Sequence, residues 1–286
     1  MDKERQQREH GTFIPMTSVN SGEGREVTED VYYYTDQIAN IICIGNPNDG
    51  KWVLVDAGLP NAAEDIKSFV YDRFGKDSRP AAIILTHGHF DHVGGLADLI
   101  DEWDVTVYAH EIELPFLQGE KDYPEPDMSV EGGMLAKISG LYPNEAINLG
   151  DRVKALPEDN SVPELEDWEW IHTPGHTPGH VSFYRKSDSL LISGDAFITV
   201  RQDSFYNVLN QEEEVNGPPR YLTTDWKLAY ESVKALEALR PHIVVPGHGS
   251  AMEGEDLTEG LRRLVDHFQS LAVPDYGRYV NDENLH

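Results

Sequence analysis

The sequence predicts an α+β fold, a four-layer αβ/βα sandwich in which two sheets pack face to face with helices outside them. Two observations favour this fold. Short runs rich in β-branched and aromatic residues, which are typical of strands, alternate with stretches of helical spacing. The same plan, several strands followed by a helix and another strand, occurs in each half of the chain.

The first half begins with a meander of strands. We expect strands at residues 31–34, 38–44 and 51–56, a tight turn at 46–50, and further strands at 81–85 and 105–108. Helices are expected at residues 61–74 and 95–100, and Gly75 is a natural stop for the longer one.

The second half repeats this pattern after a different kind of segment. Residues 111–150 are interrupted by prolines and a glycine pair, so we expect an irregular, partly helical segment that is a candidate lid. Strands are then expected at residues 169–172, 181–184, 190–193 and 243–245, with a loop at 199–224 and helices at 226–239 and 257–271. Residues 1–25 are charged and are predicted to form a loose N-terminal arm, with residues 26–286 as a single domain.

The composition excludes several classes of partner. The chain carries 51 acidic and 23 basic residues, a formal net charge of -28, which repels nucleic acid and anionic membrane surfaces. No stretch approaches the roughly 20 apolar residues of a membrane span. The lone Cys43 lies in an apolar run, where a small buried hydrophobe is expected rather than a nucleophile. A cytoplasmic protein with a small-molecule substrate is the expectation, and the oligomeric state stays open.

The strongest chemical signal is the run Thr86-His87-Gly88-His89-Phe90-Asp91-His92, directly after a predicted strand. Neutral imidazoles and carboxylates are good ligands for zinc, iron or manganese. Alternation along an extended backbone sends His87 and His89 to one side, and Asp91 and His92 follow the bend. Two metal ions ~3.5–4 Å apart are a recurring design for hydrolysis.

Three later segments each place a further ligand type on a turn after a strand. They are the His/Pro/Gly stretch 172–180 with His176 at its centre, the Gly-Asp pair that ends in Asp195, and the PGHG run that contains His248. A rigid sheet fixes side chains in such positions, and the neighbouring glycines let the backbone approach a metal closely.

The order of these motifs resembles the metallo-β-lactamase superfamily, in its glyoxalase-II-like and lactonase-like branch, over about residues 28–270. The resemblance implies the fold named above and the following metal ligands: His87, His89 and His176 for a first ion, Asp91, His92 and His248 for a second, and Asp195 bridging both. Asp56 matches a position that supports the site from behind, although a plain strand-end role is the alternative. His180, beside the His176 turn, is a further candidate for a supporting or pocket-lining role.

The resemblance also implies a reaction. Two divalent ions, zinc first, with iron or manganese as alternatives, would hold a bridging hydroxide that attacks a lactone, ester or thioester carbonyl, and Asp91 would orient the nucleophile or pass a proton. A glutathione thioester is disfavoured, because only Arg262, Arg263 and Arg278 are basic after His248. The alternative is an iron-dependent oxidoreductase such as a persulfide dioxygenase, although the complete second ligand set argues for two metals.

Overall fold

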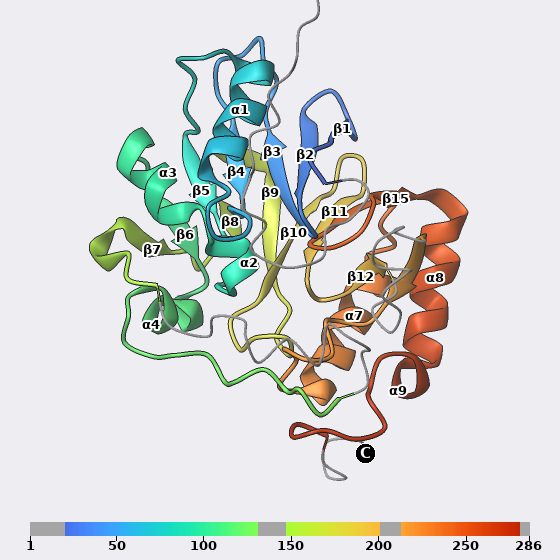
Figure 1. Ribbon diagram of the computed structural model, residues 1–286. Helices are drawn as coiled ribbons and strands as arrows, with labels where there is room; N and C mark the ends of the chain where they lie inside the picture. Colours follow the sequence, from blue (N-terminus) through green and yellow to red (C-terminus); the bar gives the residue numbers. More distant parts are fainter. Residues whose placement is uncertain (1–20, 131–146, 201–212, 281–286) are drawn as a thin grey trace, which may run out of the picture.

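Two mixed sheets form the centre of the computed structural model, which describes residues 21–130, 147–200 and 213–280 (Figure 1). The first sheet has the order β1 (Gly24–Glu26), β2 (Val31–Asp36), β3 (Ala39–Ile44), β4 (Val53–Val55), β5 (Ala82–Ile84), β6 (Val107–Ala109) and β7 (Val153–Ala155). Its neighbours pair antiparallel as far as β4 and parallel from β4 to β7. The parallel strands therefore present their carboxyl ends at one edge.

The second sheet has the order β15 (Met252–Glu253), β14 (Ile243–Pro246), β11 (Leu190–Gly194), β10 (Val181–Arg185), β9 (Leu165–His172) and β8 (Ser161–Val162). Only the β11–β14 pair in it is parallel. A separate pair is made by β12 (Ile198–Val200) and β13 (Glu213–Asn216).

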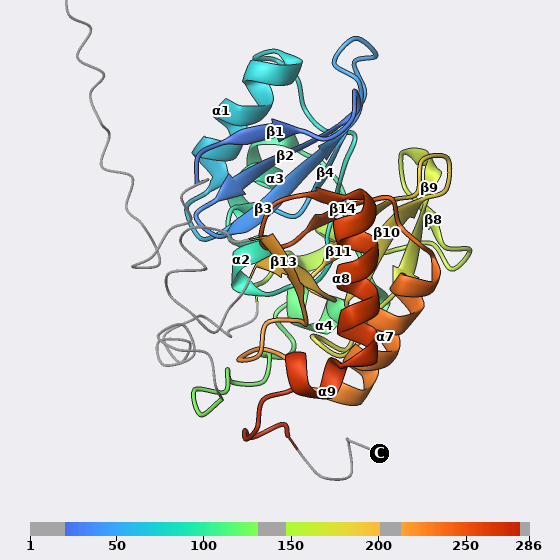
Figure 2. The same cartoon turned by 90° about the vertical axis from the view of Figure 1, so that its right-hand side faces the viewer.

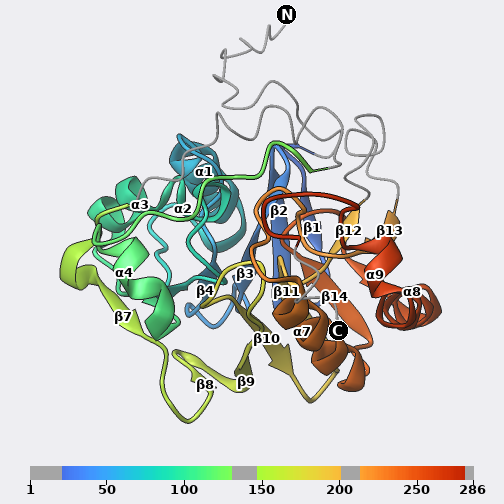
Figure 3. The same cartoon turned by 90° about the horizontal axis from the view of Figure 1, so that it is seen from below.

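Helices cover the outer face of each sheet (Figure 3). On the first side lie α1 (Ala63–Phe74), α2 (Phe90–Val93), α3 (Leu96–Trp103) and α4 (Leu114–Leu117), with the 3-10 turns η1 (Glu111–Glu113) and η3 (Gly150–Arg152). On the other side lie α7 (Trp226–Ala238), α8 (Gly254–Asp266) and α9 (Phe268–Leu271), seen from outside in Figure 2. Within the described ranges, none of the helices has the length and apolar character needed to traverse a bilayer.

Strand alternation sorts the buried side chains into layers. In β3, Ile41 and Cys43 pack with α1 and α3, whereas Ile42 and Ile44 face the second sheet. In β11, Leu191 packs against α7 and α8, while the residues on either side of it in sequence point to the first sheet. The cores lie between helix and sheet, sheet and sheet, and sheet and helix, which confirms the predicted four-layer α+β sandwich.

The structure overturns the sequence-based expectation at three places, and it also contains β7, β8 and β15, which the sequence analysis did not expect. The predicted arm reached residue 25, but residues 24–26 pair with β2 as β1, and residues 1–20 lie outside the described residues. The predicted loop 199–224 contains β13, whose Val215 packs into the core beside α8. The predicted closing helix breaks at His267, where φ is −127° and ψ is 24°, so α8 and α9 are separate. Residues 131–146 of the candidate lid are also outside the described residues.

Candidate metal centre

Strand ends bring the predicted ligand residues to one place. His87 and His89 follow β5, and the short helix α2 then carries Asp91 and His92. His176 lies in the loop from β9 to β10. Asp195 directly follows β11, and His248 lies two residues beyond the end of β14. Backbone hydrogen bonds join the two halves of the chain beside these loops. The N–H of Val181 donates to the carbonyl of Thr86 at 2.9 Å, and the N–H of Asn40 donates to the carbonyl of Gly247 at 2.8 Å.

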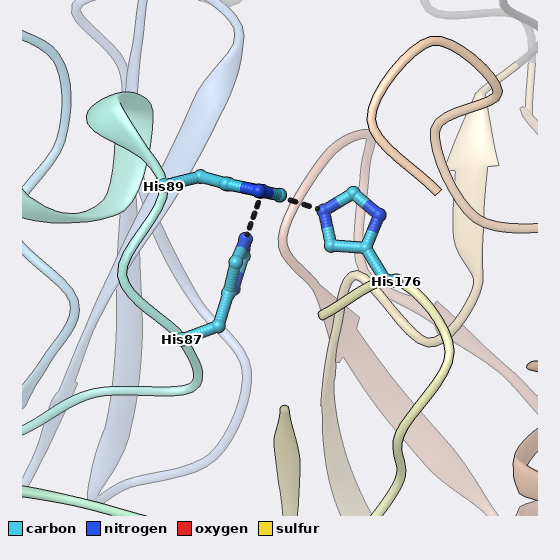
Figure 4. Close-up of side chains that lie close together, drawn as sticks. All are labelled: His87, His89 and His176. Atoms are coloured by element: carbon cyan, nitrogen blue, oxygen red, sulfur yellow. Dashed lines mark hydrogen bonds between the residues drawn. The ribbon is translucent and has the colours of Figure 1, made fainter. Parts of the chain in front are cut away.

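Three histidines from two loops point their ring nitrogens at one another (Figure 4). His89 Nδ1 lies 3.1 Å from His87 Nε2 and 2.9 Å from His176 Nε2. All three side chains are buried. We call these residues the three-histidine group, and their spacing is compatible with ligation of a single metal ion.

A second group lies directly beside the first and consists of Asp91, His92 and His248. Asp195 stands between the two groups. Its Oδ2 atom is 3.3 Å from His176 Nε2 and 3.2 Å from His248 Nε2. One carboxylate oxygen thus contacts both groups, as a bridging ligand would.

Hydrogen bonds on the far side of the rings set the tautomers. His248 Nδ1 is 2.9 Å from the carbonyl oxygen of Ile38, which can only accept, so this nitrogen carries the proton. His92 Nδ1 likewise donates to Asp56 Oδ2 at 2.8 Å. In both rings Nε2 therefore faces the cluster, and it offers a lone pair to a metal once the ring is neutral.

Unpartnered buried atoms test whether the site fits a cation. Asp91 Oδ1, His92 Nε2 and Asp195 Oδ1 are buried and have no hydrogen-bond partner in the part of the chain that the structure describes. Leaving such groups unsatisfied costs about 1–3 kcal/mol each. Buried oxygen and nitrogen atoms without hydrogen-bond partners are the donor types that divalent cations bind, so these residues fit a metal site.

The charge states of the three-histidine group also suit ligation. Burial, which disfavours the imidazolium form, lowers the pKa of His89 to about 3 and holds the pKa values of His87 and His176 well below the usual value. Burial opposes the charged form of His92 too, but the surrounding carboxylates, Asp195 first, raise its pKa well above the usual value. The three-histidine group is therefore neutral at neutral pH and ready to bind a metal.

Asp56 and His180 contact predicted ligand residues, but not through the side-chain atoms that converge on the site. Asp56 has a left-handed backbone, with φ of 61°, and accepts hydrogen bonds from the backbone and hydroxyl of Thr86 at 2.8 and 2.7 Å, besides the one from His92. His180 Nε2 accepts the backbone N–H of Asp195 at 2.8 Å, and its Nδ1 contacts the Thr173 hydroxyl at 2.8 Å. Burial lowers the pKa of His180 to about 3, consistent with a neutral acceptor.

Sequence reasoning missed two hydroxyl groups that hold ligand rings. Thr86 Oγ1 lies 3.1 Å from His87 Nδ1, and Thr223 Oγ1 lies 3.1 Å from His176 Nδ1. Thr86 adjoins the histidine motif in sequence and could have been found there. Thr223 is 47 residues from its partner, within a predicted loop, and had no sequence signal.

Asp56→Asn is expected to weaken metal binding at the second group about 10- to 100-fold, the usual range for partners of ligand residues. The backbone N–H of Thr86 needs the amide oxygen, so the amide nitrogen would face His92 Nδ1. The imidazole would then move its proton to Nε2 and lose the lone pair that faces the cluster. Competition titration of zinc against a chelator measures the change. Asp159→Asn alters an exposed carboxylate on a separate turn, so it should leave the zinc affinities of both ligand groups unchanged.

Comparisons with known proteins show which family the chain resembles. The family model described as the metallo-beta-lactamase superfamily matches residues 34–248. A probable metallo-hydrolase of Bacillus subtilis (strain 168), YflN, is 44% identical over 260 residues, which cover 91% of this chain and 98% of that protein. A hydroxyacylglutathione hydrolase of Erwinia tasmaniensis is 29% identical over 160 residues, 56% of this chain and 48% of that enzyme.

A solved structure agrees at the level of the fold. The archaeal metallo-beta-lactamase superfamily protein ST1585 from Sulfolobus tokodaii superposes with a TM-score of 0.56 at 22% identity, over 90% of this chain and 85% of that one. The family model spans most of the chain and includes every residue of both ligand groups. With its His/Asp cluster at the strand ends of a four-layer sandwich, the chain belongs to the metallo-beta-lactamase superfamily of metallo-hydrolases.

Proposed function

We propose that this protein is a dinuclear metal-dependent hydrolase that cleaves a carbonyl substrate, a lactone or an ester foremost. The observation that carries the proposal is the position of Asp195 Oδ2, within 3.3 Å of a histidine nitrogen from each ligand group. His87, His89 and His176 would hold the first ion, Asp91, His92 and His248 the second, and Asp195 both. Imidazole and carboxylate donors suit zinc, and also iron or manganese.

The chain's own residues prepare the site for hydrolysis. Bound divalent ions would lower the pKa of a water molecule to about 7 and would polarise a carbonyl oxygen. The carboxylates of Asp91 and Asp195 offset only part of the charge of two divalent cations, so the centre stays attractive to a carbonyl oxygen. Asp91 Oδ1, buried and without a hydrogen-bond partner among the described residues, is free to hold a proton for the attacking water or the leaving group.

The substrate class rests on the relatives and on charge. The similarity to a hydroxyacylglutathione hydrolase supports carbonyl chemistry, but it spans less than half of that enzyme. The basic residues expected for a glutathione carrier are few after His248. We therefore place lactones and esters ahead of thioesters.

Metal-quantified protein assayed against lactones, esters, thioesters, β-lactams and phosphodiesters tests the proposal. We expect two metal equivalents per chain and lactone or ester turnover that is lost on chelation and restored by added zinc. Phosphodiesters cleaved faster than any carbonyl substrate would contradict the substrate class. A protein that takes up no transition metal would contradict the mechanism, and bound iron with persulfide oxidation would select the redox alternative.

A further inference from the structure

Glu113 is a buried carboxylate that the proposed reaction does not use. It ends η1, just beyond β6, and its side chain has no exposed surface. Its Oε1 atom accepts hydrogen bonds from the Thr177 hydroxyl at 2.8 Å and from the Gly179 backbone at 2.9 Å. Its Oε2 atom accepts from the Gly88 backbone at 3.1 Å and from the Tyr123 hydroxyl.

Three of these four donors come from the two loops that form the three-histidine group. Gly88 stands between His87 and His89, and Thr177 follows His176 directly. The two loops are about 90 residues apart in sequence and belong to different halves of the sandwich. One carboxylate therefore ties together the two segments whose histidines must meet.

The fit around Glu113 is close. A Cβ atom on Gly88 would lie 2.4 Å from the Tyr123 hydroxyl oxygen, and one on Gly179 would lie 2.7 Å from Glu113 Cγ. Both positions need glycine because the loops lie directly against this pair of side chains. The Tyr123 ring also packs edge-on against His89, with ring centroids 4.8 Å apart. Glu113 and Tyr123 thus both contact the histidine loops.

Packing alone does not explain a carboxylate here. Burial raises the pKa of Glu113, because the charged form loses its hydration, and the four donors oppose that effect. An apolar side chain of similar volume would fill the space without this cost. An apolar side chain would lack the two carboxylate oxygens, which accept hydrogen bonds from both histidine loops.

We propose that Glu113 is a positioning residue that, together with Tyr123, holds His89 and His176 at the separation that a metal ion requires. The inference rests on the proposed function only in that the three-histidine group binds a metal. It does not depend on the substrate or the reaction.

Glu113→Gln tests it. Each carboxylate oxygen of Glu113 accepts from two donors, and the amide nitrogen of glutamine cannot accept a hydrogen bond. Two of the four donors would therefore lose their acceptor, and the two histidine loops would separate. We expect cobalt or zinc affinity of the three-histidine group to fall about 10- to 100-fold, while the second group changes little. Titration of metal-free protein with Co²⁺, followed by the d–d absorption bands, separates the two steps, and His89→Ala identifies the step that belongs to this group.

Two further variants separate positioning from folding. Tyr123→Phe keeps the carboxylate and the ring, so it should fold and weaken the same step by about tenfold or less. Asp127→Asn is the matched control, since this buried carboxylate also accepts backbone and hydroxyl hydrogen bonds, from Ser129 and Arg278. It should lower the unfolding temperature of the metal-free protein and leave both affinities unchanged.

The outcomes distinguish the two proposals. If Glu113→Gln and Tyr123→Phe lower the unfolding temperature but bind Co²⁺ at the three-histidine group as tightly as the wild type, Glu113 is only structural and the inference is wrong. If the wild type itself binds no Co²⁺ at the three-histidine group, the proposed function is contradicted, and with it the metal binding on which the Glu113 inference rests.

Discussion

Asp195→Ala is expected to reduce turnover by well over 100-fold. This loss exceeds the roughly 10- to 100-fold loss that follows mutation of a residue that only hydrogen-bonds to a metal ligand. Asp195 Oδ2 lies 3.2 Å from His248 Nε2 and 3.3 Å from His176 Nε2, so its loss removes an anionic donor from both groups at once. It also removes a negative charge that balances two cations. Both metal affinities should fall together. Inductively coupled plasma measurement of bound metal, alongside activity on the best ester or lactone, checks both losses.

Asp188→Asn is the control for this variant. Asp188 precedes the start of β11, whereas Asp195 follows its end, so the two carboxylates lie at opposite ends of the strand. Asp188 forms an ion pair with Arg185 at 2.8 Å. It should retain full metal content. If Asp195→Ala keeps two metal ions and half of its activity, the carboxylate does not bridge the centre, and the ligand assignment must be redrawn.

The sequence predicted the layers of the fold because burial follows alternation. The run at residues 41–44 is apolar throughout, as expected of a strand covered on both faces, and its residues divide between two cores. Short pairings were harder. The β12–β13 pair has a register shift between Ile198 and Val200, and so short an irregular pair leaves little periodic signal. The break at His267 was hidden because apolar residues continue beyond it into α9.

The predicted ligand residues were within reach of sequence reasoning because their motifs come soon after strands. The parallel neighbours β11 and β14 present their carboxyl ends at one edge of the second sheet, and β5 presents its carboxyl end from the first sheet. Supporting residues were less accessible. Glu113 is 25 residues from Gly88 and 66 from Gly179, and no motif surrounds it. Its role follows only from the packing of two loops from different halves, which no local pattern records.

Asp91→Ala is expected to lose the second metal ion and to lower kcat by about 10²- to 10⁴-fold, the range for a positioned general acid or base. Asp91 Oδ2 is 3.4 Å from His248 Nε2, and its other oxygen has no hydrogen-bond partner in the described residues. One oxygen is thus placed to bind the metal and the other to carry a proton. Metal content and kcat should therefore fall together, whereas Asp98→Asn, an exposed change on α3, should alter neither.

Asp91→Asn separates the two tasks, because the amide keeps a neutral oxygen donor but cannot shuttle a proton. With the second ion restored by excess zinc, this variant should remain slow on substrates with poor leaving groups, such as alkyl esters, and recover most on thioesters and aryl esters. The dependence of kcat on the pKa of the leaving group measures this difference, and its slope should steepen in the variant. An unchanged slope with full metal content would show that Asp91 only binds the ion and that the leaving group takes its proton from elsewhere.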